Sequence, residues 1–207
     1  HRECVATAVE HLAKARSRHS VRLVESGTNE GKGSAIRRGW GAADPNAAWL
    51  GFLDADGAIS ARELFRLIRM LGDDLDLLAG SRILMAGRQV HRSAYRHLQG
   101  RVFATLAERA FHLKVYDTQC GAKLVRTTLV HALFDEPFVS GWIFDVELLA
   151  RLRNLIGVEA LLARTVEAPL DTWRDVAGSK LNARHMLRAP LELWRIARRY
   201  NQVPGRG

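Results

Sequence analysis

The chain has 207 residues, of which 47% are hydrophobic, so it is long and apolar enough to bury a core and is not a disordered tail. Its formal net charge of +9 favours an anionic partner. No apolar run approaches the roughly 20 residues of a membrane-spanning helix, and Cys4 and Cys120 lie too far apart in sequence for a paired-ligand zinc motif or a disulfide framework, which fits a reducing compartment.

The first 80 residues alternate between patterns typical of helices and of strands. In chain order they predict a helix over 5–12, a short strand over 21–25, a glycine-started helix over 31–43, a strand over 48–54, a helix over 60–71 and an apolar run over 75–80. Ser60 followed by Glu63 is a capping-box pattern. Such alternation predicts a largely parallel sheet with helices on both faces, in which ligands gather at the carboxyl ends of strands.

The remainder of the chain shows longer helical patterns. They predict a helix over 92–115, a strand over 120–125, a helix over 142–155, a strand over 158–170 closed by Pro169, and an amphipathic helix over 184–200 that is interrupted or restarted at Pro190. We expect one domain over 1–182 and a basic amphipathic tail over 183–207.

Two stretches concentrate the positive charge. The run from Ser81 to Ala107 holds no acidic residue but five arginines, and the run from Arg184 to the end holds six arginines against the single acid Glu192. In the second run leucine, tryptophan and isoleucine lie between the arginines, which favours an anionic surface as partner. A solvated charged face is the alternative for either run.

The sequence GFLDADG ends an apolar strand with two carboxylates one residue apart. Asp54 and Asp56 can approach one hard cation, and Mg²⁺ or Mn²⁺ held in this way completes its shell with phosphate oxygens of a substrate. A plain Asp-rich turn is one alternative. The nucleophile loop of haloacid-dehalogenase-type phosphatases is another, although those enzymes typically place Thr or Val where this chain has Ala58.

The sequence GTNEGKGSAIRRG does not satisfy the spacing of a P-loop, which requires four residues between its glycines and a Ser or Thr after the lysine. Lys32 still begins a helix beside two glycines, where free backbone N–H groups favour an anion. The alternative is a solvated lysine on a tight turn.

Taken together, the segments NEGKGSAIRRG, LDADG, GSR, DTQCGAKL, GWIFDVELL and WRDVAGSKL resemble, in that order, the family-two glycosyltransferases of the polyprenyl-phosphate sugar synthase kind. The likeness runs from about residue 21 to residue 181 and is greatest to the dolichyl-phosphate β-glucosyltransferases. It implies an α/β GT-A fold with a Rossmann-like, mostly parallel sheet. It also implies an inverting transfer of a hexose from a nucleotide-diphosphate sugar to a polyprenyl phosphate, assisted by Mg²⁺ or Mn²⁺.

The same resemblance implies a place for the enzyme. It would lie in the cytoplasm, peripheral to the inner face of an anionic membrane, and have no nucleic acid partner.

On the donor side, the resemblance implies roles for five residues. Asp54 and Asp56 would bind the metal and the diphosphate, and Lys32 would contact the donor. Gln119 would line the sugar pocket, and Trp142 would stack on the sugar ring. The alternatives are that Gln119 only satisfies a loop backbone and that Trp142 belongs to the core.

On the acceptor side, the resemblance implies that Arg82 and Arg92 or Arg96 clamp the lipid phosphate. Two acidic side chains would be catalytic: Asp117, which also lines the sugar pocket, and Asp145. Glu147 follows Asp145 in the same motif, and it could instead face solvent.

The chemistry of the reaction supports these roles. Cleavage of a sugar–diphosphate bond leaves negative charge on the leaving group, which a metal and nearby cations stabilise. A phosphate monoester acceptor is already an anion near neutral pH, because its second pKa is about 6, so a strong general base is optional.

Two motifs of the family are not found in this sequence: the first strand with its Pro-x-Tyr-Asn-Glu loop, and the second strand ending in Asp-Asp-Gly-Ser. We therefore expect a GT-A domain that lacks its N-terminal strands and is inactive in this form. Two other classes compete with the transferase: a phosphatase built on the DADG turn, and a non-catalytic module that binds a membrane surface or a carbohydrate.

Overall fold

A computed structural model describes residues 22–91, 94–174 and 183–201. The elements are α2 (Lys32–Gly41), β1 (Trp49–Leu53), α3 (Ala61–Ile68), β2 (Leu77–Ser81), β3 (Gln89–His91), α4 (Ala94–Phe111), β4 (Ala122–Arg126), α5 (Thr127–Phe134), α6 (Phe144–Ile156), α7 (Val158–Ala163), β5 (Thr165–Pro169), β6 (Thr172–Arg174) and α8 (Ala183–Tyr200).

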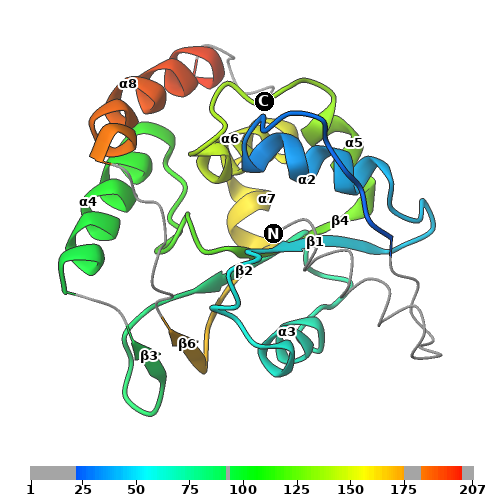
Figure 1. Cartoon of the computed structure of the whole chain (residues 1–207), viewed down its shortest axis with the longest axis horizontal. Helices are drawn as coiled ribbons and strands as arrows, with labels where there is room; N and C mark the ends of the chain where they lie inside the picture. Colours follow the sequence, from blue (N-terminus) through cyan, green and yellow to red (C-terminus); the bar gives the residue numbers. More distant parts are fainter. Residues whose placement is uncertain (1–21, 92–93, 175–182, 202–207) are drawn as a thin grey trace.

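Four strands form the central sheet in the order β1-β4-β2-β5. β2 pairs with β5 in parallel, whereas β4 runs antiparallel to both of its neighbours, β1 and β2. Three of the four strands therefore point the same way, and their carboxyl ends lie at one edge. Figure 1 shows α3 on one face of the sheet and α2, α5, α6 and α7 on the other.

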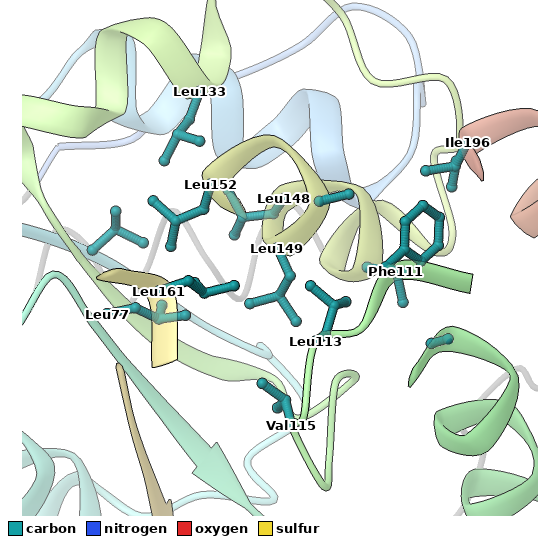
Figure 2. Close-up of a cluster of buried hydrophobic side chains, with 14 of the residues drawn as sticks. Leu77, Phe111, Leu113, Val115, Leu133, Leu148, Leu149, Leu152, Leu161 and Ile196 are labelled. Atoms are coloured by element: carbon teal, nitrogen blue, oxygen red, sulfur yellow. The ribbon is translucent and has the colours of Figure 1, made fainter. Parts of the chain in front are cut away.

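Each face of the sheet carries its own core, because side chains alternate along a strand. In β2, Leu77 belongs to the larger core, and its neighbour Leu78 belongs to the smaller core under α3. The larger core is centred on α6, whose residues from Phe144 to Leu152 are all buried. Figure 2 shows Leu148 and other leucines of this helix within the cluster.

Most of the predicted elements are present, with bounds that differ by a few residues. Ser60 caps α3 as predicted, since its hydroxyl accepts the backbone N–H of Glu63. The Glu63 side chain turns elsewhere: it accepts hydrogen bonds from Arg66 and from the backbone N–H of Asp171. The predicted helix over 5–12 lies outside the described residues.

One strand prediction was wrong, and a second was correct only for its second half. Residues 22–25 form no strand. The predicted strand over 158–170 is a short helix, α7, followed by β5. The first half of that segment, VEALLA, is rich in helix formers, and Gly157 starts the helix with a positive φ of 87°. An apolar run of this length does not by itself distinguish a helix from a strand.

The terminal helix also differs from the expectation. α8 runs unbroken from Ala183 to Tyr200 with Pro190 inside it, so the predicted interruption there was wrong. α8 packs against α4 and α6, and Figure 1 shows it beside α4 at the upper left. Leu193 and Ile196 belong to the larger core, which holds in place the part of the helix that follows the proline.

A smaller sheet lies beside the central one. β3 and β6 pair in parallel, with Gln89 opposite Thr172 and His91 opposite Arg174. Among the residues that the structure describes, no helix combines the length and the apolar character that a bilayer span requires.

Candidate active site

The DADG turn and the DTQCG segment meet at the carboxyl end of β1. Because β4 is antiparallel to β1, its first residue, Ala122, lies opposite the last residue of β1, Leu53. The backbone N–H of Asp54 donates to the carbonyl oxygen of Gly121 at 2.8 Å. A Cβ on Gly121 would lie 1.9 Å from Asp54 Oδ2, so only glycine leaves room for the carboxylate at this position.

The two carboxylates of the turn differ in their surroundings. Asp56 is exposed, and its Oδ1 accepts the backbone N–H of Ala58 at 3.0 Å in a turn completed by Gly57 with φ of 75°. Asp54 is half-buried and forms an ion pair with Lys32. Across the described ranges, no three acidic, histidine or cysteine side chains gather to hold a metal ion. Any cation at this turn therefore needs oxygen atoms from elsewhere.

Lys32 is the first residue of α2 and reaches two carboxylates. Its Nζ lies 2.6 Å from Asp54 Oδ1 and 3.6 Å from Asp145 Oδ2. The ammonium also lies 5.0 Å from the ring centre of Phe52 and 5.1 Å from that of Phe144. Burial by itself lowers the pKa of Lys32, but the negative charges of Asp145 and Asp54 outweigh it and raise that pKa. Lys32 is therefore a firmly charged cation at the strand ends.

A second lysine, which the sequence analysis did not single out, lies beneath the first. Lys123 in β4 is fully buried, and its Nζ donates to Asp145 Oδ1 at 2.7 Å and to the carbonyl oxygen of Cys120 at 2.8 Å. Asp145, in the first turn of α6, is 3% exposed. The signal in the sequence was a lysine inside an otherwise apolar strand, since a buried charge requires a partner.

The predicted acceptor ligand Arg82 and the predicted catalytic Asp117 form one ion pair. Arg82 Nε and Nη2 donate to the two Asp117 oxygens at 2.7 and 2.8 Å, and the backbone N–H of Arg82 also donates to Asp117. Burial lowers the pKa of the Arg82 guanidinium, and the Asp117 charge outweighs that effect and raises it. Glu167 in β5 holds the same loop by accepting the backbone N–H groups of Tyr116 and Asp117, each at 2.7 Å.

Four predicted site residues remain: Gln119, Trp142, Arg92 and Arg96. Trp142 is half-buried, with its ring 6.4 Å from that of Phe103 in α4, and Gln119 is half-buried in the loop before β4. Arg92 lies outside the described residues, and of Arg96 only the backbone, within α4, is described. The predicted roles of these four residues stay predictions.

Glu147 does not face solvent. It is fully buried, and its carboxylate accepts hydrogen bonds from Arg151 at 2.7 Å, from the Tyr200 hydroxyl at 2.9 Å and from the backbone N–H of Val139 at 2.8 Å. Every one of these donors belongs to α6, α8 or the loop before α6. The arrangement makes Glu147 a residue that joins α8 to the domain.

The sequence matches the family described as Glycosyl transferase family 2 over residues 4–134, more than half of the chain. The chain belongs to glycosyl transferase family 2. The resemblance seen in the motifs is thereby confirmed.

Two relatives illustrate where in the family the chain lies. A dolichyl-phosphate beta-glucosyltransferase of Saccharomyces cerevisiae is 30% identical over 174 residues, which cover 77% of this chain and 49% of the relative. The human protein of the same description is 30% identical over 173 residues, covering 78% of this chain and 49% of the relative. The chain thus spans about half the length of these curated relatives.

Solved structures confirm the fold class. Glucosyl-3-phosphoglycerate synthase from Mycobacterium tuberculosis superimposes with a TM-score of 0.59 at 16% identity, covering 88% of this chain and 59% of that one. The same enzyme in complex with Mn²⁺, UDP-glucose and glycerol 3-phosphate gives a TM-score of 0.53 at 18% identity, covering 84% and 56%. At these identities the likeness concerns the fold, which is the predicted GT-A type.

Proposed function

We propose that the protein transfers a hexose from a nucleotide-diphosphate sugar to a polyprenyl phosphate, with inversion at the sugar. The observation that carries this proposal is the meeting of Lys32, Asp54 and Asp145 at the carboxyl ends of the strands, in a chain of family two. The names of the relatives, which are dolichyl-phosphate glucosyltransferases, support the acceptor class.

The donor diphosphate would bind at the DADG turn. Asp54 and Asp56 fit a hard divalent cation, because both offer carboxylate oxygens on one turn and Asp56 is open to water. With only two carboxylates there, the diphosphate oxygens would complete the coordination. When bound, such a cation neutralises charge on the leaving diphosphate. The Mn²⁺ in the glucosyl-3-phosphoglycerate synthase complex supports a divalent cation.

Lys32 would bind the same diphosphate from the other side. It lies at the N-terminus of α2, where unpaired backbone N–H groups also favour an anion. A fixed cation at this place meets the negative charge that develops as the sugar–oxygen bond breaks. Gln119 and Trp142 would then contact the sugar, as the resemblance implies.

The acceptor phosphate needs orientation more than it needs a base. Asp145 lies between two ammonium groups and Asp117 lies in a bidentate pair with Arg82, so both carboxylates already have cationic partners within the protein. We therefore propose that both act as positioning residues and that the lipid phosphate attacks as an anion. Arg92 and Arg96 would bind that phosphate, with Arg82 as a half-buried support for the loop.

We also propose that α8 meets an anionic lipid surface at the inner face of the membrane. One face of the helix, with Leu193 and Ile196, is buried. The opposite face is exposed and carries Leu191 and Trp194 among arginines: Arg188, Arg195, Arg198 and Arg199. An exposed tryptophan flanked by basic residues is typical of helices that lie in the headgroup region. The division into a catalytic domain over 1–182 and a tail over 183–207 is part of this proposal.

Product analysis tests the proposed function. The protein, extended at its amino end so that it carries the two N-terminal strand motifs of the family, is incubated with a panel of nucleotide sugars, Mn²⁺ or Mg²⁺, and a short-chain polyprenyl phosphate. Formation of a lipid-linked hexose is the expected result. Release of free phosphate from a phosphomonoester would instead favour the phosphatase, which the family match does not support, and donor binding without either product would favour a non-catalytic module.

A further inference from the structure

Four charges of alternating sign form a chain from the core to the DADG turn. Lys123 contacts Asp145 at 2.7 Å, Asp145 faces Lys32 at 3.6 Å, and Lys32 contacts Asp54 at 2.6 Å. Lys32 is thus shared by two carboxylates, and it makes the short contact with Asp54.

Burial divides this chain of charges into a fixed and an adjustable half. The side chains of Lys123 and Asp145 are 0% and 4% exposed, whereas those of Lys32 and Asp54 are 34% and 36% exposed. A buried pair with hydrogen bonds to fixed partners stays in place, since separating it would leave an unpaired buried charge. Lys32, in contrast, has a flexible four-carbon stem and water on one side.

We infer that Lys32 occupies Asp54 as a built-in counter-ion, and that it transfers to Asp145 when a divalent cation takes the Asp54 carboxylate. This inference rests on the proposed function, because it takes Asp54 to be a ligand of the cation. Lys123 is then a positioning residue: it fixes Asp145 as the second acceptor for Lys32.

The geometry makes the transfer a small movement. Closing the 3.6 Å separation between Lys32 Nζ and Asp145 Oδ2 to a charged hydrogen bond of about 2.8 Å needs a shift of about 1 Å. The rings of Phe52 and Phe144 face the ammonium at 5.0 and 5.1 Å, so a cation–π contact is available during the movement. The Asp54 carboxylate would stay neutralised before and after the exchange.

The exchange has a functional consequence. A cation that binds without the nucleotide sugar has to displace Lys32 from Asp54, and its only protein ligands are then two carboxylates. A cation that arrives with a diphosphate gains phosphate oxygens, and the displaced Lys32 remains near enough to contact the same diphosphate. The pair of lysines therefore favours loading of the cation and the donor together.

Binding of Mn²⁺ alone, followed by the electron paramagnetic resonance signal of free Mn²⁺, tests this inference without any activity measurement. Lys32→Met should bind Mn²⁺ about two- to fivefold more tightly than the native protein, since the competing half-exposed ion pair is gone. Asp145→Asn should bind Mn²⁺ more weakly by a similar factor, because Lys32 then has only Asp54. Lys114→Met, which removes an exposed lysine, is the matched control and should leave the affinity unchanged.

A double variant tests whether weaker Mn²⁺ binding by Asp145→Asn comes from misfolding. Asp145→Asn leaves Lys123 buried without a carboxylate, so the double variant Lys123→Met/Asp145→Asn, which removes both charges, should show the same weakening in a stable fold. The differences in Mn²⁺ affinity between the variants should persist in about 1 M salt, because the screening length there is about 3 Å and only direct contacts between charges remain effective.

Three results would overturn the inference: unchanged or weaker binding by Lys32→Met, native affinity in both Asp145 variants, or no Mn²⁺ binding by any form. Sugar transfer by the protein extended at its amino end, together with unchanged Mn²⁺ affinities, would reject the exchange of Lys32 alone. Altered affinities without any transfer product would instead reject the proposed function.

Discussion

The two faces of α8 should respond differently to substitution. Ile196 is 0% exposed in the larger core, whereas Trp194, two residues earlier on the same helix, is 56% exposed. Truncation of a fully buried Ile to Ala costs about 2–5 kcal/mol, because burial is lost and a cavity remains. Against a total free energy of unfolding of about 5–15 kcal/mol, this is a large fraction. Trp194→Ala should change the free energy of unfolding by less than about 0.5 kcal/mol.

Urea denaturation measures the change in the free energy of unfolding, and sedimentation with anionic vesicles measures the change in lipid binding. Trp194→Ala should keep the native denaturation midpoint but lose vesicle binding, and Ile196→Ala should lower the midpoint. These point variants separate the two roles better than removal of the helix, which would also uncover the core beneath Leu193. Equal destabilisation by both variants would refute the packing of α8, and full vesicle binding by Trp194→Ala would refute the lipid-facing role.

Three further predictions concern the site. Gly121→Ala should abolish Mn²⁺-dependent binding of a nucleoside diphosphate in calorimetry while the fold is retained, because the new Cβ would displace the Asp54 carboxylate; native affinity would contradict the contact. Asp56→Ala should have the same effect on metal-dependent donor binding without loss of stability, because Asp56 is exposed, and unchanged Mn²⁺-dependent affinity would remove the metal assignment. Burial raises the pKa of Cys120 from 9.0 to about 12, so the unfolded thiol ionises first and the free energy of unfolding should fall as the pH rises above about 9. In a Cys4→Ser variant, Cys120 should resist thiol reagents at pH 8, and rapid labelling of the folded protein would show that it is not buried.

Local patterns in the sequence predicted elements but not their pairing. The capping residue Ser60 and the alternation of apolar runs located α3 and β1, since these signals act over a few residues. The direction of β4 is not encoded in such patterns, because a strand reads the same in either direction. The same limit applies to the helix α7, whose apolar residues also fit a strand.

The candidate site could be predicted as a set of motifs, but not as a set of contacts. Asp54, Asp145 and Lys32 were identified one by one, and only the fold shows that a single ammonium faces both carboxylates. Lys123 was missed because its partner lies 22 residues away, in a different element. The pairing of Arg82 with a carboxylate 35 residues away was hidden for the same reason.

The stereochemistry of the product tests the central claim most directly. The protein extended at its amino end is incubated with the nucleotide sugar that the panel identifies, Mn²⁺ and a polyprenyl phosphate, and the isolated glycolipid is analysed by proton NMR. We predict that an α-linked donor yields a β-linked hexosyl phosphate, and that Asp56→Ala yields none. An α-linked product, or a product formed equally well by Asp56→Ala, would contradict the account of an inverting transfer at the DADG turn.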